Sequence, residues 1–278
     1  MSDRLRAPRP IAVGPVFRAD RAALLALLTE LSPREWTLPT VCAGWDVRDV
    51  ALHVLGGDLG NISRRRDGVR AAEPGPGETL GALLARVNQQ WVETARRLSP
   101  RLTVELLAMA GPLIADVFDA LNPDALGGPV SWAGAGPAPV WLDVAREYME
   151  RWVHQQHIRD AVRRAGQGEA RFSAPVIAAS MHALPKALAA HAEPEGTVLV
   201  VEIEGDAGGE WSVVREPGGW TLYEGAGRDA RTSISVPADV WWRVVTLGMT
   251  PGDAWRKATT GGEPSLARAA LGAVAIIA

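Results

Sequence analysis

Residues 148–160 read Tyr-Met-Glu-Arg-Trp-Val-His-Gln-Gln-His-Ile-Arg-Asp, and the interpretation of the whole chain depends on this stretch. If it is helical, Glu150, His154 and His157 are spaced i, i+4 and i+7 and lie on one face of the helix. A carboxylate and two imidazoles in one column supply the oxygen and nitrogen donors that zinc and other divalent transition metals bind. The stretch therefore predicts half of a metal site, with a solvated polar face as the alternative.

The residues around this column favour the metal site over the solvated face. An apolar stripe roughly opposite the column contains Trp141, Val144, Ala145, Tyr148 and Trp152. Met149, Val153 and Ile158 border the column itself, and a helix that is apolar on most of its circumference is buried. Because unpaired charge is costly in a protein interior, a buried glutamate and two histidines must be paired or must bind a cation.

The composition is that of a soluble protein without a nucleic-acid partner. The 278 residues are 47% hydrophobic and 22% charged. The net charge of −3 shows no excess of basic residues of the kind that nucleic-acid binding requires. The single cysteine, Cys42, excludes an internal disulfide and fits a reducing cytoplasm. We find no signal peptide and no apolar run long enough to span a membrane, so we expect a cytoplasmic protein. Two lysines beside abundant Ala, Arg, Gly and Pro indicate an actinobacterial type of source.

The first part of the chain predicts a bundle of four main helices. Asp20 is expected to cap the first helix, and Asp46 with Asp49 to form a capping box at the start of the second. Gly56-Gly57 is expected to end or loosen the second helix, and polar loops are expected over 61–77 and 122–139. The expected helices cover 19–31, 46–57, 78–98 and 140–164, with shorter helical pieces over 102–121 that are interrupted at Gly111-Pro112. This pattern is typical of a helical bundle.

After Gly166 the pattern changes to a mixture of helices and strands. A helix is expected over 174–191, and Pro237 is expected at the first position of another helix. Strands are expected over 197–204, 210–215, 220–223 and 231–236, and short helices near 251–258 and 264–271. We therefore predict an α+β fold with two domains, a helical bundle over 1–168 and a smaller α+β domain over 169–278.

Two short motifs resemble those of a known family. Residues 42–54 read Cys-Ala-Gly-Trp-Asp-Val-Arg-Asp-Val-Ala-Leu-His-Val, and residues 150–158 read Glu-Arg-Trp-Val-His-Gln-Gln-His-Ile. In order and spacing they resemble the two signatures of the mycothiol-dependent maleylpyruvate isomerase family, which is one of the DinB-like metal-binding helical bundles. The C-terminal half resembles that family's second domain, a sterol-carrier-like α+β domain. Residues 262–267 through 276–278 resemble the closing helix and strand of that domain. The resemblance covers nearly the whole chain.

The resemblance implies a metal site and a thiol cosubstrate. It implies that His53, Glu150 and His154 hold a divalent ion, most often zinc, and three protein ligands leave a position open for water or substrate. It also implies mycothiol, a low-molecular-weight thiol, as cosubstrate. A metal-bound thiol loses its proton and can add to a small electrophile, which an isomerase then releases as an isomer and a transferase as the adduct.

The sequence departs from the family at His157, where the family usually has aspartate. His157 can be a fourth ligand, a residue that supports a ligand, or a general base at the open position, and we favour the last two roles. Cys42 is interpreted as a packing residue of the loop and not as a nucleophile. Arginines are the candidates for contacting an anionic substrate, namely Arg48, Arg146, Arg159 and, from the second domain, Arg228, Arg231 and Arg243.

Two other functions are compatible with the sequence. One is a hydrolase that uses metal-bound water on the same bundle. The other is a non-catalytic protein that binds a small molecule. The expected partners are a small thiol and a small electrophile, with neither nucleic acid nor membrane, and the chain is expected to be a monomer or a homodimer.

Overall fold

We analysed a computed structural model, which describes residues 5–69 and 72–276. The chain divides into two compact units. The unit we call the helical unit comprises Val13–Asn122 and Glu150–Gln167. The α+β unit comprises 5–12, Pro123–Met149 and Gly168–Ile276. The fold class predicted from the sequence, a helical part followed by an α+β part, is confirmed.

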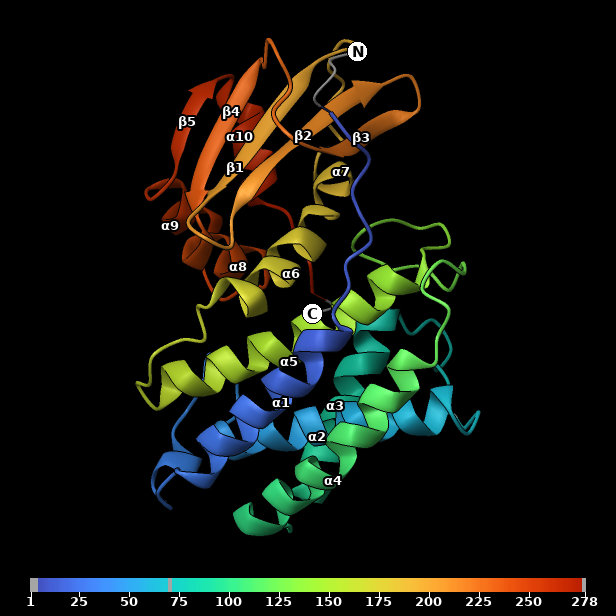
Figure 1. The fold of residues 1–278 in the computed structure, drawn as a ribbon, viewed down its shortest axis with the longest axis vertical. Helices are drawn as coiled ribbons and strands as arrows, with labels where there is room; N and C mark the ends of the chain where they lie inside the picture. Colours follow the sequence, from blue (N-terminus) through green and yellow to red (C-terminus); the bar gives the residue numbers. More distant parts are fainter. Residues whose placement is uncertain (1–4, 70–71, 277–278) are drawn as a thin grey trace. The chain divides into compact units, whose positions relative to one another are not determined.

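The helical unit is built around a layer of long helices (Figure 1). Its helices are α1 (Gly14–Thr29), η1 (Glu35–Thr37), α2 (Val47–Arg65), α3 (Leu80–Ala95), α4 (Pro100–Asp119) and the second half of α5 (Val140–Ala161). Helix α4 packs against α1 and α2, and α3 packs against α2. The shared apolar core contains Leu24, Leu28, Val50, Leu55, Leu107 and Ile158. The core brings α1, α2, α4 and α5 together from distant parts of the sequence.

The first helix begins earlier than the sequence suggested, and Asp20 does not cap it. Pro15 lies in the first turn, where its missing N–H costs nothing, so the helix begins at Gly14. Asp20 is consequently inside the helix and only 4% exposed. Its carboxylate accepts a hydrogen bond from Gln155 Nε2 at 3.1 Å. The capping box of Asp46 and Asp49 at the start of α2 is confirmed.

Helix α2 continues without a break through Gly56-Gly57 to Arg65. The prediction that these glycines end or loosen the helix, and the predicted loop over 61–65, were therefore wrong. Gly56 is small because α3 lies against it. A Cβ atom at this position would be 2.4 Å from the Trp91 ring, and that ring is held by a 2.7 Å hydrogen bond from Nε1 to the Leu52 carbonyl. Gly56 therefore permits close packing of two helices and does not end one.

Helix α4 is also continuous, so the predicted interruption at Gly111-Pro112 was wrong. A Cβ atom on Gly111 would lie 2.8 Å from Arg21 Cγ. The guanidinium of Arg21 donates a 3.3 Å hydrogen bond to the Leu107 carbonyl, one turn before Gly111. The glycine therefore makes room for a buried arginine from α1, and the proline is tolerated on the exposed side of α4.

A buried ionic cluster joins three of the helices. Asp58 of α2 is 0% exposed. One carboxylate oxygen accepts from Arg21 NH2 of α1 at 2.5 Å, and the other accepts from Arg151 Nε of α5 at 2.9 Å. A buried carboxylate is costly unless its charge is compensated, and two arginines compensate it here. The cluster therefore fixes α1, α2 and α5 relative to one another.

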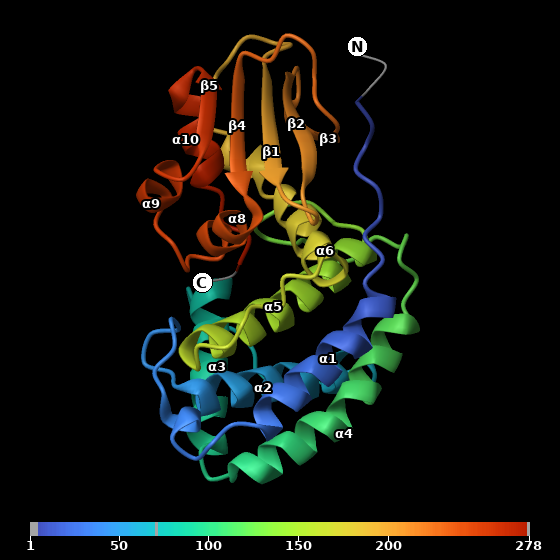
Figure 2. The same ribbon diagram turned by 60° about the vertical axis from the view of Figure 1, so that its left-hand side comes forward.

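The α+β unit contains a five-stranded sheet of order β3-β2-β1-β4-β5, seen across Figure 2. Strands β1 and β4 are parallel, and the other neighbours are antiparallel. The strands are β1 (Val198–Glu204), β2 (Gly209–Glu216), β3 (Gly219–Glu224), β4 (Thr232–Pro237) and β5 (Thr259–Gly262). The helices are α6 (Ala170–Met181), α7 (Leu184–Ala187), α8 (Ala238–Val245), α9 (Pro251–Trp255) and α10 (Pro264–Leu271).

One face of this sheet is covered by helices. In β1, Leu199, Val201 and Ile203 are buried while the alternate residues Glu202 and Glu204 are exposed. Helices α7, α8 and α10 pack against the sheet. This alternation with a period of two is what an antiparallel or mixed sheet with one covered face requires.

The predicted strands β1 to β4 are confirmed, while three details of the second part differ. The single helix expected over 174–191 divides into α6 and α7 at His182 and Ala183. Strand β5, with the sequence Thr-Thr-Gly-Gly, was missed because it lacks apolar alternation and all its residues are exposed. Pro237 is the N-cap residue of α8 and not its first helical residue. Residues 277–278 of the predicted second domain lie outside the described residues, and the boundary at 168/169 stays a prediction.

The close contact of α2 with α3 makes Gly56→Ala destabilising. The added methyl group must displace the anchored Trp91 ring, so we expect the free energy of unfolding to fall by about 1–3 kcal/mol in urea titrations. Gly57→Ala is the matched control, because a Cβ atom there meets nothing within 4 Å. Its higher helix propensity should leave stability unchanged or raise it by up to about 1 kcal/mol. Equal effects of the two substitutions would contradict this description.

Asp20 makes the stability of the protein depend on pH. Burial raises the pKa of its carboxyl from 3.8 to about 7, although Arg21, Arg151 and Arg159 partly offset the rise. The neighbouring Gln155 is uncharged, and its amide suits either form. Between about pH 4 and 7 the folded state therefore holds a proton that the unfolded state has lost. The contribution of Asp20 to stability is present below pH 4 and is lost as the pH rises towards 7.

We expect Asp20→Asn to remove this dependence. The difference is up to about 4 kcal/mol, from roughly three pKa units at about 1.4 kcal/mol each. Urea denaturation at pH 5 and pH 8 covers about two of these three units, so we expect a difference of roughly 3 kcal/mol between the two pH values. The exposed Asp119→Asn is the control. Parallel pH profiles for the wild type and Asp20→Asn would show that Asp20 is not the group responsible.

Candidate metal centre

Three of the residues singled out in the sequence converge within the helical unit. His53 comes from α2, and Glu150 and His154 come from consecutive turns of α5. One ligand atom from each of the three lies within 4.8 Å of the other two. The rings of His53 and His154 are edge to face with centroids 4.6 Å apart, and His154 Nε2 is 3.6 Å from Glu150 Oε2. Side chains from two helices therefore form one compact group.

The local structure explains how these side chains are held. The capping box at Asp46 fixes the start of α2, and His53 follows two turns later. The centroids of the Trp45 and His53 rings are 5.0 Å apart. Trp45 Nε1 donates a 2.9 Å hydrogen bond to Gln89 Oε1 on α3. On α5, residues 151–158 are all buried, as the apolar flanks of the column predicted.

The electrostatics suit metal ligation. Burial, together with the charge of Arg151, lowers the pKa of His154 to about 4, so the imidazole is neutral near pH 7. A neutral imidazole keeps the nitrogen lone pair that a metal needs. His154 is 7% exposed, and its Nδ1 has no hydrogen-bond partner in the part of the chain that the structure describes. Two imidazoles and a carboxylate are also the donor set of many zinc sites, so the residues fit such an ion.

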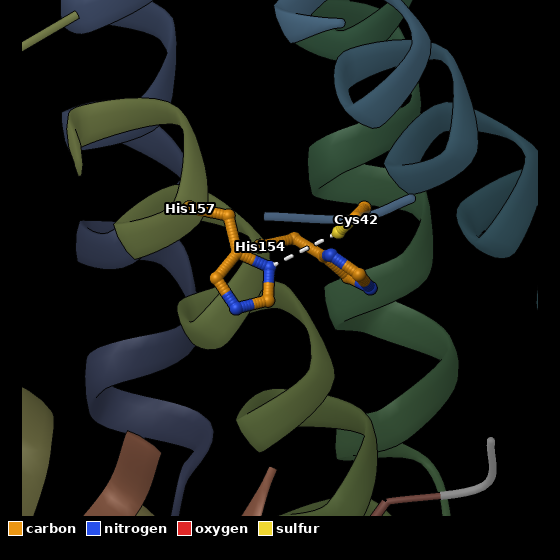
Figure 3. A group of neighbouring side chains, drawn as sticks. All are labelled: Cys42, His154 and His157. Atoms are coloured by element: carbon orange, nitrogen blue, oxygen red, sulfur yellow. Dashed lines mark hydrogen bonds between the residues drawn. The ribbon is translucent and has the colours of Figure 1, made fainter. Parts of the chain in front are cut away.

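A second group of possible ligands shares His154. Cys42 Sγ lies 3.3 Å from His157 Nδ1, and Cys42, His154 and His157 each offer a ligand atom within 4.8 Å of the other two (Figure 3). His157 is only 5% exposed. Burial raises the pKa of the Cys42 thiol, a hydrogen bond with Thr40 opposes that rise, and the Glu150 carboxylate adds to it. The thiol is therefore neutral at pH 7, which disfavours a reactive nucleophile.

Sequence reasoning missed the contact between Cys42 and His157. Cys42 does pack against the apolar core, as a loop packing residue should. The two side chains are 115 positions apart, and no spacing in the sequence links a loop cysteine to one face of a later helix. A ligand atom of His157 lies close to those of Cys42 and His154, in a different group from His53 and Glu150. This arrangement does not decide between the roles predicted for His157, which stay predictions.

The candidate arginines are spread over both units. Arg228, Arg231 and Arg243 belong to the α+β unit, while the His and Glu ligands belong to the helical unit. Arg231 lies 3.6 Å from Glu193, and Arg243 pairs with Asp239 on the same helix and covers the Trp242 ring. Arg146 pairs with Asp143 and Glu147. Arg48 and Arg159 donate to the carbonyls of Leu98 and Ala165. Substrate contact by any of them stays a prediction.

Comparison with known proteins agrees with the sequence motifs. Residues 17–159 match the family model described as the mycothiol maleylpyruvate isomerase N-terminal domain, which is slightly more than half of the chain. No curated protein gives a significant match. Within the described residues, no helix combines the length and the apolar character that a bilayer span needs.

Solved structures share the fold at low sequence identity. The crystal structure of the mycothiol-dependent maleylpyruvate isomerase matches with a TM-score of 0.52 and 14% identity, over 90% of this chain and 92% of that chain. The crystal structure of a histidine-to-alanine mutant of that isomerase gives a TM-score of 0.52, 12% identity and the same coverage. At these identities the matches show a common fold. Sterol Carrier Protein 2 from Yarrowia lipolytica (apo form) matches 49% of this chain with a TM-score of only 0.24, which supports no conclusion.

The fold and the site define a class: two-part α+β proteins whose helical part gathers histidine and glutamate side chains from two helices. Within that class, the chain belongs to the mycothiol maleylpyruvate isomerase N-terminal domain family. The family predicted from the two sequence motifs is thereby confirmed.

Proposed function

We propose that this protein is a metal-dependent enzyme that activates a low-molecular-weight thiol, mycothiol, for addition to a small electrophile. Membership of the family supports the thiol. The observation that carries the proposal is the convergence of His53, Glu150 and His154 in a chain of this family. A cytoplasmic location, an actinobacterial source and a monomeric or homodimeric state remain predictions.

In the proposed enzyme, His53, Glu150 and His154 hold the ion, with zinc as the most suitable choice. A bound divalent ion favours the thiolate form of a thiol that coordinates it. The three residues would supply two imidazole nitrogens and one carboxylate oxygen, and three protein donors would leave room for a thiol as a further ligand. Trp45 packs on His53 and keeps the ring in place, and the bond from Arg151 to Asp58 ties to α2 the part of α5 that carries Glu150 and His154.

The reaction then depends on how the electrophile is placed. The thiolate sulfur adds to an electron-poor carbon, and the electron pair of the double bond moves onto the neighbouring carbonyl. In an isomerase the new single bond rotates and the thiolate leaves again, which restores the double bond in the other configuration. In a transferase the adduct takes up a proton and is released. Arg228, Arg231 and Arg243 are the proposed contacts for a carboxylate of the substrate, and His157 is the proposed proton carrier.

We expect His53→Ala and Glu150→Gln to lose stoichiometric zinc and thiol-dependent turnover. Both variants are made with Cys42→Ser, so that the second group of ligands cannot hold the ion. Losing one of three ligands should weaken zinc binding by more than about 100-fold, because even residues that only support a ligand contribute 10–100-fold. Zinc content and turnover with and without added thiol are measured against Cys42→Ser alone.

His191→Ala is the matched control, because this histidine belongs to the α+β unit and to neither ligand group. It should keep its zinc. Undiminished zinc in both ligand variants would reject the metal site. Turnover without any added thiol would reject thiol activation and favour the hydrolase, and a zinc-loaded protein with no turnover of thiol and electrophile would favour a non-catalytic binding protein.

A further inference from the structure

The chain contains a sulfur donor beside the proposed metal site. Cys42 comes from the loop between η1 and α2, and His154 and His157 come from adjacent turns of α5. Cys42 Sγ and His157 Nδ1 are 3.3 Å apart, the rings of His154 and His157 have centroids 5.4 Å apart, and the three ligand atoms lie within 4.8 Å of one another. Figure 3 shows the contact between Cys42 and His157, with the His154 side chain beside them.

The distances are close to those of a metal centre with one sulfur and two nitrogen ligands. For zinc, with bonds of about 2.3 Å to sulfur and about 2.0–2.1 Å to nitrogen, tetrahedral ligand atoms are roughly 3.4–3.6 Å apart. The Cys42–His157 separation already falls near this value. The remaining pairs are at most 4.8 Å apart, so a shift of roughly 1 Å by a side chain closes the set.

The backbone around Cys42 holds it in place. Its N–H donates to Thr40 Oγ1 at 3.2 Å, and its carbonyl accepts from the Trp45 N–H at 3.0 Å. Thr40 in turn donates to the Trp45 carbonyl through both its N–H and its hydroxyl. Gly44, with φ of +78°, makes this turn possible. The sulfur is thus presented to α5 by a loop closed by hydrogen bonds and not by a loose segment.

We propose that Cys42, His154 and His157 form a second coordination site, for a borderline cation such as zinc or cobalt(II), that shares His154 with His53 and Glu150. A thiolate with two imidazoles selects such ions against magnesium and calcium, which prefer oxygen donors. On binding, the Cys42 S–H gives its proton to the solvent and the sulfur forms the bond to the ion. No oxidant or reductant takes part.

Sharing His154 makes the two sites alternatives for a single ion. A neutral imidazole has one nitrogen with a free lone pair, because the other carries a proton. His154 can therefore serve one ion at a time. The ion is held either by His53, Glu150 and His154 or by Cys42, His154 and His157, and the protein thereby carries its own sulfur ligand next to the place proposed for the external thiol.

Cobalt(II) added to the metal-free full-length protein tests this inference, because a thiolate bound to cobalt gives a charge-transfer band in the near ultraviolet. In the wild type we expect this band to reach its limit at one cobalt per chain. His53→Ala should keep or strengthen the band, because the ion is confined to the sulfur-containing set. Cys42→Ser should bind cobalt without the band, and His154→Ala should lose tight cobalt binding by either set.

His157→Ala and His157→Gln, each combined with His53→Ala, test the third ligand. We expect at least a tenfold loss of cobalt affinity in both, of the order seen when a metal site loses a supporting residue. Circular dichroism and thermal unfolding show whether each variant is folded, and His191→Ala is again the control. Cobalt binding with no sulfur band in both the wild type and His53→Ala would overturn the inference, as would full affinity in both His157 variants.

These results are separate from the test of the proposed function, on which this inference partly rests through His154. A sulfur band without thiol-dependent turnover would support the second site and contradict the proposed function. Bound zinc and thiol-dependent turnover without a sulfur band would support the proposed function and contradict the second site.

Discussion

The ionic cluster of Asp58 with Arg21 and Arg151 is the interaction on which the geometry of the helical unit depends. Asp58 is completely buried and follows His53 by five residues on α2, while Arg151 precedes His154 by three residues on α5. A charge in that position cannot remain without partners, because its desolvation costs several kcal/mol. The pairing therefore sets how α2 and α5 lie against each other. His53 faces His154 as a consequence of that arrangement.

The same constraint governs the other polar residues of α5. Gln155 is buried and donates to Asp20, and the Gln156 side chain accepts from the Gln167 N–H at 2.8 Å. Both glutamines thus bond to a residue outside α5, and each of these bonds adds a restraint on the position of the helix. A helix that is buried on all sides yet rich in polar residues is held more specifically than one with an apolar surface alone. Such a helix can carry Glu150 and His154 with little freedom of position.

The sequence could predict those features that depend on neighbouring residues. The column of Glu150 and His154, the burial of α5 and the capping box at Asp46 all follow from helical spacing and from short-range hydrogen bonds. Strands β1 to β4 follow from alternation with a period of two. The ends of the helices could not be predicted so well, because Gly56 and Gly111 owe their presence to side chains of other helices and not to a turn. The same holds for the approach of Cys42 to His157 and of Arg151 to Asp58, which join residues far apart in the chain.

The histidine at position 157 has a consequence for charge that aspartate would not have. Related sequences are expected to have aspartate there, and an aspartate would place a second negative charge beside Glu150 and next to the Cys42 thiol. That charge would oppose the loss of the thiol proton, since like charges in a poorly solvated region repel strongly. A neutral imidazole offers a donor to the same space without adding charge. A divalent ion held by the Cys42 thiolate and two neutral imidazoles would keep a single positive charge, as would an ion held by Glu150 and two imidazoles. Only binding by Cys42, however, requires the loss of a thiol proton close to the Glu150 carboxylate. If both sets bind an ion, the choice between them would depend on the preference of the ion for sulfur or oxygen and on competition from external thiol.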